Sequence, residues 1–271
     1  MVQELFQYSF IKHAVAAAIL SSIVCGLIGT IIVEKRLVSM SGGIAHTAFG
    51  GIGLGYLLGI EPIFGGLIFS ILASLGIASI KRKTNTNADA LVGIFWAFGM
   101  GLGILFIALT PGYAPDMTSY LFGNILTVSR DYISIMIILT SIIVLLIIGP
   151  FHYWRMYLFD EEFAFVKGLP VVKMEYILFI LISLSIVILI KVVGIILAIA
   201  LLTIPPAISK IFIRNYMGIM ILSAIIGIVL SMAGLYLSYL YDIPSGSSII
   251  LVSAISYIVI VAGRKLVRIK N

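Results

Sequence analysis

One imidazole, that of His46, stands inside a long apolar run of the sequence, Leu37–Tyr56, which contains no Asp, Glu, Lys or Arg. A metal-binding side chain at membrane depth is costly and typically marks a solute pathway. The Ser-Met-Ser-Gly-Gly stretch at 39–43 predicts a break in the helix just before His46, as in the discontinuous helices of transporters. The alternative is a structural histidine that is hydrogen-bonded to the backbone of a neighbouring helix. The residues of this run therefore indicate an ion pathway with few ligand side chains.

The composition excludes an ordinary soluble domain. The chain has 271 residues, of which 62% are hydrophobic and only 10% charged, whereas soluble domains carry about 25% charged residues. The net charge of +6 arises from short basic clusters between apolar runs, a pattern of membrane topology signals rather than of a nucleic-acid surface. A single cysteine, Cys25, excludes a disulfide framework and a cysteine metal cluster. The amino terminus predicts no removable signal peptide.

Apolar runs divide the chain into transmembrane segments, each of which needs about 20 residues to cross the hydrocarbon core. They predict an all-α integral membrane protein, a polytopic bundle of eight to nine helices forming a single domain over 1–271. The count stays open because the second run is short and two joins are tight. The nine runs are 14–33, 44–60, 63–80, 90–110, 132–149, 175–190, 192–212, 217–240 and 246–262.

The basic residues predict the orientation, because cytoplasmic loops are enriched in Lys and Arg. With nine spans and a cytoplasmic carboxyl terminus, only Lys12, Arg130 and Lys191 fall on the outer side. The other 14 of the 17 basic residues fall on the inner side: Lys35, Arg36, Lys81, Arg82, Lys83, Arg155, Lys167, Lys173, Lys210, Arg214, Arg264, Lys265, Arg268 and Lys270. We therefore expect a multi-pass protein of the cell membrane with its amino terminus outside.

The one substantial inner loop, 151–173, contains a short amphipathic helix between Phe159 and Pro170. Its expected N-cap is Asp160, followed by two acids that suit the first turn, and Gly168 is placed to end it. We expect this loop to contact a cytoplasmic partner; the alternative is a helix that lies on the lipid surface. The residues assigned to the contact are Asp160, Glu161, Glu162, Phe163, Val166 and Gly168.

The glycines of the second apolar run fall on two different faces of the predicted helix. Gly51, Gly55 and Gly59 recur every four residues and predict a packing seam for a neighbouring helix. At about 100° per residue they lie opposite His46, whereas Gly50 and Gly53 lie within about 40° of it, which predicts an open face around the imidazole. Further on, the Pro205-Pro206 pair frees the carbonyls near Leu201 and Leu202, which must find partners or line a cavity.

Several motifs, taken together and in their order along the chain, resemble those of the permease subunits of the ABC-3 family. These subunits are ABC type II importer-like permeases for zinc, manganese or iron. The resemblance runs over nearly the whole chain. The motifs are Phe10–Ala14 through Gly29, Lys35–Leu37, Ser41–Gly55, Asp89–Gly93, Asp116–Asn124, Phe165–Pro170, Val193–Gly194 through Ile204–Ala207, and Tyr241–Gly246.

The resemblance implies a homodimer that translocates a divalent metal ion, with ATP hydrolysed on cytoplasmic ATPase subunits and the ion delivered by an external metal-binding protein. It implies no permanently bound cofactor, and it makes 151–173 the ATPase-coupling loop. His46 becomes the metal residue. Two residues depart from the family: Gly42 stands where many members have an acid, and Asn124 where aspartate is common. Loss of a hard oxygen donor weakens the case for manganese and leaves Zn²⁺, or another borderline ion, as the expected cargo, with manganese or iron as alternatives. The pathway-lining residues that we expect are Ser39, Gly42, Gly50, Gly53, Thr203 and Pro205.

The remaining polar residues have plainer interpretations. Asp116 and Asp242 fall on the predicted outer side. They could form an acidic entrance for the ion or a contact for the delivering protein, and the alternative is that they are ordinary polar residues of loops. Asp89 suits a helix N-cap, and we expect His13 and His152 not to bind metal.

Other classes of protein fit less well. The chain lacks the His-Glu-x-x-His motif of a zinc protease and the phosphate-binding loop of an ATPase, and it buries few ionisable groups for a secondary transporter. An ABC permease for another small metal-containing or non-metal solute stays open.

Overall fold

The chain folds into a bundle of helices, and no strand occurs in the part that the computed structural model describes, residues 9–84, 86–112, 120–121, 123 and 125–270. The all-helical membrane fold predicted from the sequence is confirmed. In chain order the elements are α2 (Ser9–Glu34), α3 (Val38–Leu58), α4 (Pro62–Thr84), α5 (Ala88–Leu109), the 3₁₀ turn η1 (Ile125–Thr127), α7 (Arg130–Ile148), α8 (Phe151–Phe159), α9 (Glu161–Val166), α10 (Val171–Phe212), α11 (Tyr216–Tyr241) and α12 (Ser245–Lys270).

The long helix α10 consists of two halves that run in opposite directions. Its break lies at Gly194, whose φ of 77° and ψ of 166° are not helical. Before the break, Glu175 pairs with Arg82 at the end of α4, and Lys191 pairs with Glu61 just before α4 begins. After the break, Lys210 pairs with Glu34 at the end of α2. The first half is therefore antiparallel to α4, and the second is parallel to α2.

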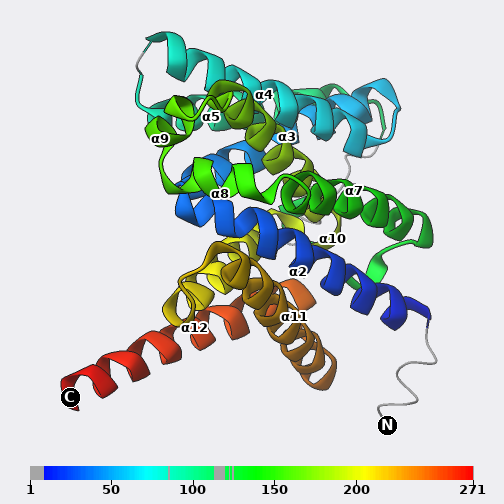
Figure 1. Ribbon diagram of the computed structural model, residues 1–271. Helices are drawn as coiled ribbons and strands as arrows, with labels where there is room; N and C mark the ends of the chain where they lie inside the picture. Colours follow the sequence, from blue (N-terminus) through cyan, green and yellow to red (C-terminus); the bar gives the residue numbers. More distant parts are fainter. Residues whose placement is uncertain (1–8, 85, 113–119, 122, 124, 271) are drawn as a thin grey trace.

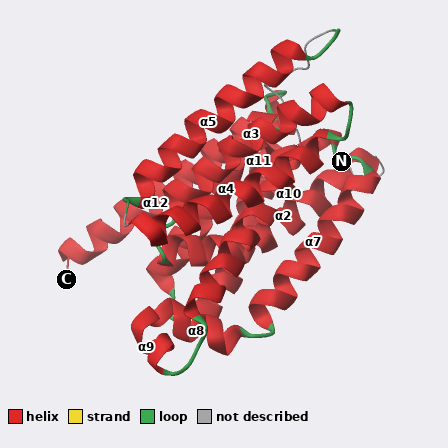
Figure 2. Cartoon of the chain, turned by 90° about the horizontal axis from the view of Figure 1, so that it is seen from above, coloured by secondary structure: helices red, strands yellow, loops and turns green. Residues whose placement is uncertain are grey.

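Two ends of the bundle follow from these pairs. We call the end that holds α8 and α9 the α9 end (Figure 2) and the opposite end the Glu61 end. The chain reaches the α9 end at Glu34, because the adjacent Lys35 pairs with Glu161 of α9. Counting the two halves of α10 separately, nine long helical segments of the described chain run between the ends, within the eight to nine predicted.

Seven helices of the described chain are long and apolar enough to cross a membrane when α10 counts once. The helix outside this set is α3, which has 21 residues and no charged side chain. Its many glycines and small polar residues make it less apolar than its neighbours. It can span because it is buried among other helices rather than exposed to lipid: most of its residues lie in the core.

The bundle has a buried centre and lipid-facing flanks. Helices α2 and α10 are largely buried, whereas α5, α7 and α12 are mostly exposed. In Figure 1 the group α3–α5 lies on one side of α2 and the pair α11–α12 on the other. The second apolar run is thus enclosed between α4, α5 and α10, and this arrangement decides what surrounds His46.

Candidate metal-translocation site

His46 lies near the middle of α3, with its ring stacked on the indole of Trp96 from α5. The ring centroids are 4.2 Å apart and the planes differ by 6°. The imidazole is half-buried, and its Nδ1 atom is fully buried without a hydrogen-bond partner. Buried polar atoms are usually hydrogen-bonded. Nδ1 of His46 is one of the few in the described chain that have no partner.

The helix around His46 is continuous, so the predicted break at 39–43 is wrong. Helix α3 begins at Val38, and the Ser41 hydroxyl donates to the carbonyl of Val38 (2.8 Å). Ser39 is exposed in the first turn and does not line a channel inside the described chain. Glycine and serine are poor helix formers, but burial of this segment among neighbouring helices outweighs their propensity.

The face of α3 that was expected to be open is covered by α5, which corrects the assignment of Gly50 and Gly53. A Cβ atom added to Gly50 would lie 3.0 Å from the carbonyl oxygen of Gly99, and one added to Gly53 would lie 2.6 Å from that of Gly103. The Thr47 hydroxyl bonds the carbonyl of Phe95 (3.0 Å) and ties the helices together. Both glycines thus permit close packing and do not line a pathway.

The opposite face of α3 packs on α4 at two of the three seam glycines. A Cβ on Gly51 would lie 2.0 Å from the carbonyl oxygen of Gly65, and one on Gly55 would lie 2.7 Å from the Cα of Pro62. Gly59 does not belong to this contact. It caps α3 in the left-handed conformation (φ 67°), and nothing would lie within 4 Å of its Cβ.

Gly42 faces the second half of α10. A Cβ on Gly42 would lie 3.6 Å from Cδ1 of Ile199, an ordinary contact distance, so a larger residue fits here. Within the described residues no group of three His, Cys, Asp or Glu side chains gathers to hold a metal. His46 consequently has no carboxylate partner on its own chain in that part of the structure.

The proline pair in α10 is packed rather than open. Pro205 and Pro206 are buried, and the Thr203 hydroxyl bonds back to the carbonyl of Ile199 (2.8 Å). The carbonyl of Leu202, freed by Pro206, faces Gly29 of α2 so closely that a Cβ there would lie 2.4 Å away. The Leu202 carbonyl thus meets a neighbouring helix, and Pro205 is packed in the core, whereas Thr203 is partly exposed.

Of the two predicted outer acids, the structure describes only Asp242. Asp116, like Asn124, lies outside the described residues. Asp242 is exposed and ends α11 in the left-handed conformation (φ 51°). Sequence reasoning missed the contact that does order this end, the ion pair between Lys191 and Glu61, with the ammonium 5.3 Å from the Tyr132 ring centroid. The signal was available, since both charges interrupt joins between apolar runs.

At the other end, α9 forms a capped and exposed helix. The Asp160 side chain accepts hydrogen bonds from the backbone N–H groups of Glu162 (2.8 Å) and Phe163 (3.0 Å). Gly168 has a φ of 82°, and the following Leu169 N–H bonds the Ala164 carbonyl (3.0 Å), which is how a left-handed residue closes a helix.

The apolar side chains around α9 face away from the bundle. Phe163, Phe165 and Val166 are 45%, 70% and 82% exposed. The sequence predicts that this helix begins at Phe159, but Phe159 instead ends α8, and the N-cap of α9 is the next residue, Asp160. Residues of this size left exposed in a group mark a contact surface. We call these four residues, Phe159, Phe163, Phe165 and Val166, the α9 apolar surface.

These features define a class of protein, a polytopic helical membrane protein with the half-buried imidazole of His46 inside its bundle and an exposed apolar helix at one end. Comparisons with known proteins agree. Residues 7–264 match the ABC 3 transport family, and the chain belongs to that family.

Relatives match over nearly their full length. The chain is 41% identical to an uncharacterized membrane protein of Synechocystis over 98% of this chain and 94% of that protein. It is 32% identical to the manganese transport system membrane protein MntC of Halalkalibacterium halodurans, over 93% and 86%. Among solved structures, PsaBC from Streptococcus pneumoniae in complex with Fab gives a TM-score of 0.87 at 29% identity, over 100% of both chains.

Proposed function

We propose that this chain, as a single permease domain over 1–271, imports a divalent transition-metal ion, driven by ATP hydrolysis on a separate subunit. The observation that carries the proposal is the unpartnered Nδ1 of His46 at the centre of α3. A buried imidazole nitrogen without a hydrogen bond suits a borderline metal ion, and a small number of protein ligands keeps the ion exchangeable. The names of relatives, among them a manganese transport system membrane protein, support a metal as the cargo.

The α9 end is the cytoplasmic one in this proposal. Basic side chains gather there: Lys35, Lys81 and Arg82 all form ion pairs at that end. Cytoplasmic ends of membrane proteins carry this excess. The carboxyl terminus of α12 then lies in the cytoplasm, and the ion enters from the Glu61 end.

The α9 apolar surface is the proposed site for the ATPase. It lies beside an exposed acid, Glu162, and its helix is closed by Asp160 and Gly168. A helix of one and a half turns with two acids in its first turn suits a protein groove better than an anionic lipid surface. Replacing Glu162 with Gln should weaken ATPase docking without unfolding the chain, because its exposed side chain forms no hydrogen bond or ion pair with another described residue.

A second copy completes the transporter in this proposal. Trp96, which covers His46, is 43% exposed on α5, between Ile94 and Phe98, which are both 62% exposed. A copy related by a two-fold axis at α5 would bring two His46–Trp96 pairs toward one another. This pairing would add the ligands that one chain lacks.

The ion itself is assigned by donor chemistry. With Gly42 in place of a carboxylate, the imidazole favours Zn²⁺, although relatives named for manganese make Mn²⁺ the direct competitor. The test is uptake of ⁶⁵Zn and ⁵⁴Mn by proteoliposomes that contain the permease with its ATPase and external binding protein. ATP-dependent Zn²⁺ uptake that Mn²⁺ competes for poorly is expected. Uptake driven by a proton gradient without the ATPase would instead identify a secondary transporter.

A further inference from the structure

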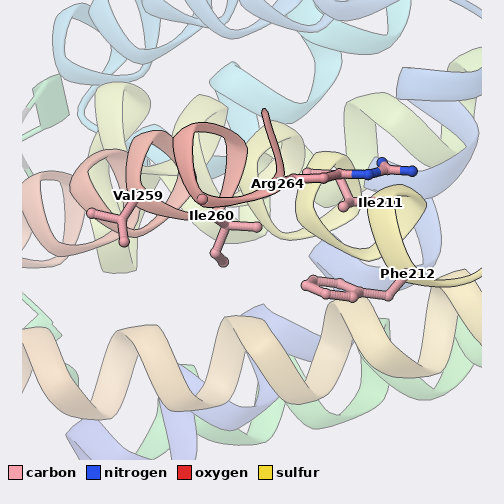
Figure 3. Close-up of a pocket in the computed structure, with 6 residues that line it drawn as sticks. Ile211, Phe212, Val259, Ile260 and Arg264 are labelled. Carbon is pink, nitrogen blue, oxygen red and sulfur yellow. The ribbon is translucent and has the colours of Figure 1, made fainter. Parts of the chain in front are cut away.

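An apolar cleft lies at the α9 end between the last turn of α10 and α12 (Figure 3), and metal transport does not account for it. Its volume is about 370 Å³. The lining residues are Ile211 and Phe212 of α10 with Val259, Ile260, Gly263 and Arg264 of α12.

The walls of the cleft are open to the surroundings of the bundle. Phe212 is 64% exposed and Val259 is 62% exposed. Gly263 leaves part of the α12 wall without a side chain, and a Cβ added there would meet nothing within 4 Å. In a helix that crosses a bilayer, such an open apolar wall faces hydrocarbon chains. The cleft is therefore shaped for a flexible chain of methylene groups.

One charge stands at the end of this cleft. Arg264 extends from α12 toward the end of α10 (Figure 3), and it forms no ion pair with any described residue. Its neighbour Lys210, by contrast, is paired with Glu34. Arg214 follows α10 in the sequence, and Lys265 and Arg268 follow Arg264. A guanidinium group presents a planar set of donors that matches a phosphate.

The depth of the cleft in the membrane suits both parts of a lipid, its headgroup and its acyl chains. The apolar run of α12 gives way to charge at Arg264 and Lys265 in the sequence, so the arginine lies at headgroup level and Val259 lies within the hydrocarbon. A second copy of the chain is a poor occupant, because a two-fold contact here would bring the basic ends of both α12 helices together. We propose that the cleft binds one anionic phospholipid, with an acyl chain against Phe212, Val259 and Ile260 and its phosphate on Arg264.

The test is native mass spectrometry of the purified permease with phosphatidylglycerol or phosphatidylcholine carrying the same acyl chains. The unchanged chain should retain one phosphatidylglycerol with about fivefold preference over phosphatidylcholine, since one basic residue contributes about that much at an anionic surface. Arg264→Gln should abolish the preference, and Gly263→Leu, which fills the cleft, should weaken retention of both lipids. Lys83→Gln removes an exposed charge at the same end and should change neither.

Three outcomes would overturn the proposal. Arg264→Gln could keep the preference for phosphatidylglycerol, or Gly263→Leu could retain both lipids as the unchanged chain does. A cysteine placed at Val259 in a Cys25→Ser background could also form a disulfide between copies in native membranes, which would assign the cleft to a second chain.

Discussion

The ammonium group of Lys35 holds α9 against the turn between α2 and α3. It lies 2.7 Å from the Glu161 carboxylate and 2.7 Å from the Tyr157 carbonyl oxygen, and 3.9 Å from the centroid of the Tyr157 ring. Burial, together with the nearby Glu161 and Glu175 carboxylates, raises the pKa of Tyr157, so its ring stays neutral beneath the cation. Three residues after Lys35, α3 begins. The Lys35 side chain thus joins α9 to the residue that lies three positions before α3.

We expect Lys35→Met and Glu161→Gln each to lower metal uptake per ATP hydrolysed, because the link from α9 to α3 is cut. Partly exposed pairs of this kind contribute at most about 1 kcal/mol to stability, so the fold should persist. Uptake and ATP hydrolysis measured together in proteoliposomes test this, with Lys173→Gln as a control at an exposed basic residue. Strictly additive effects in the double variant would show that the two groups act separately.

Gly168 should be sensitive to substitution only because of its backbone conformation. Its φ is 82°, and nothing would lie within 4 Å of an added Cβ, so a larger side chain meets no steric obstacle. Gly168→Ala should cost about 1–2 kcal/mol at this left-handed position and weaken capture of the ATPase in a pull-down. Asparagine tolerates the same conformation, so Gly168→Asn should restore much of the binding. Full capture by the alanine variant would contradict a docking role for the end of α9.

His46→Ala should lower metal uptake by about tenfold or more, a range set by the 10–100-fold effects of even outer partners in metal sites. The chain has two tryptophans, Trp96 and Trp154. In a Trp154→Phe background, emission of Trp96 should therefore change when Zn²⁺ is added, and the change should vanish with His46→Ala. An unaltered Zn²⁺ response in that variant would remove His46 from the path.

Gly42→Asp should raise Mn²⁺ uptake relative to Zn²⁺, because it places a carboxylate one helical turn before His46. An added Cβ would lie 3.6 Å from Cδ1 of Ile199, an ordinary contact distance, and a hard oxygen donor favours manganese. Competitive uptake of the two ions measures the ratio. Gly42→Asn, of similar size but without charge, should leave the ratio near that of the unchanged chain; an equal shift by both variants would point to shape rather than charge.

Gly51→Ala should destabilise the bundle by about 1–3 kcal/mol, the usual cost of overpacking. Its Cβ would lie 2.0 Å from a backbone oxygen of α4, which cannot move aside. Gly101→Ala is the matched control, since no atom lies within 4 Å of its Cβ and alanine favours the helix. Thermal unfolding in detergent compares them, and equal midpoints would refute the seam.

The sequence was sufficient for features that depend on local composition. Apolar runs of membrane-spanning length, the cap at Asp160 and the left-handed glycine at 168 follow from hydrophobicity and backbone preferences that act within a few residues. The chain reversal near residue 191 was also visible as a tight join, and the structure places it at Gly194.

Only the tertiary structure decided which face of α3 meets which neighbour. Periodicity separated Gly50 and Gly53 from Gly51 and Gly55, but both pairs prove to be packing faces, against α5 and α4. A glycine permits close approach equally to a helix or to an open path, so its presence does not distinguish them. The stacking of Trp96 on His46 and the link from Lys35 to Glu161 join residues distant in sequence. Such contacts depend on how the helices pack, which no local pattern encodes.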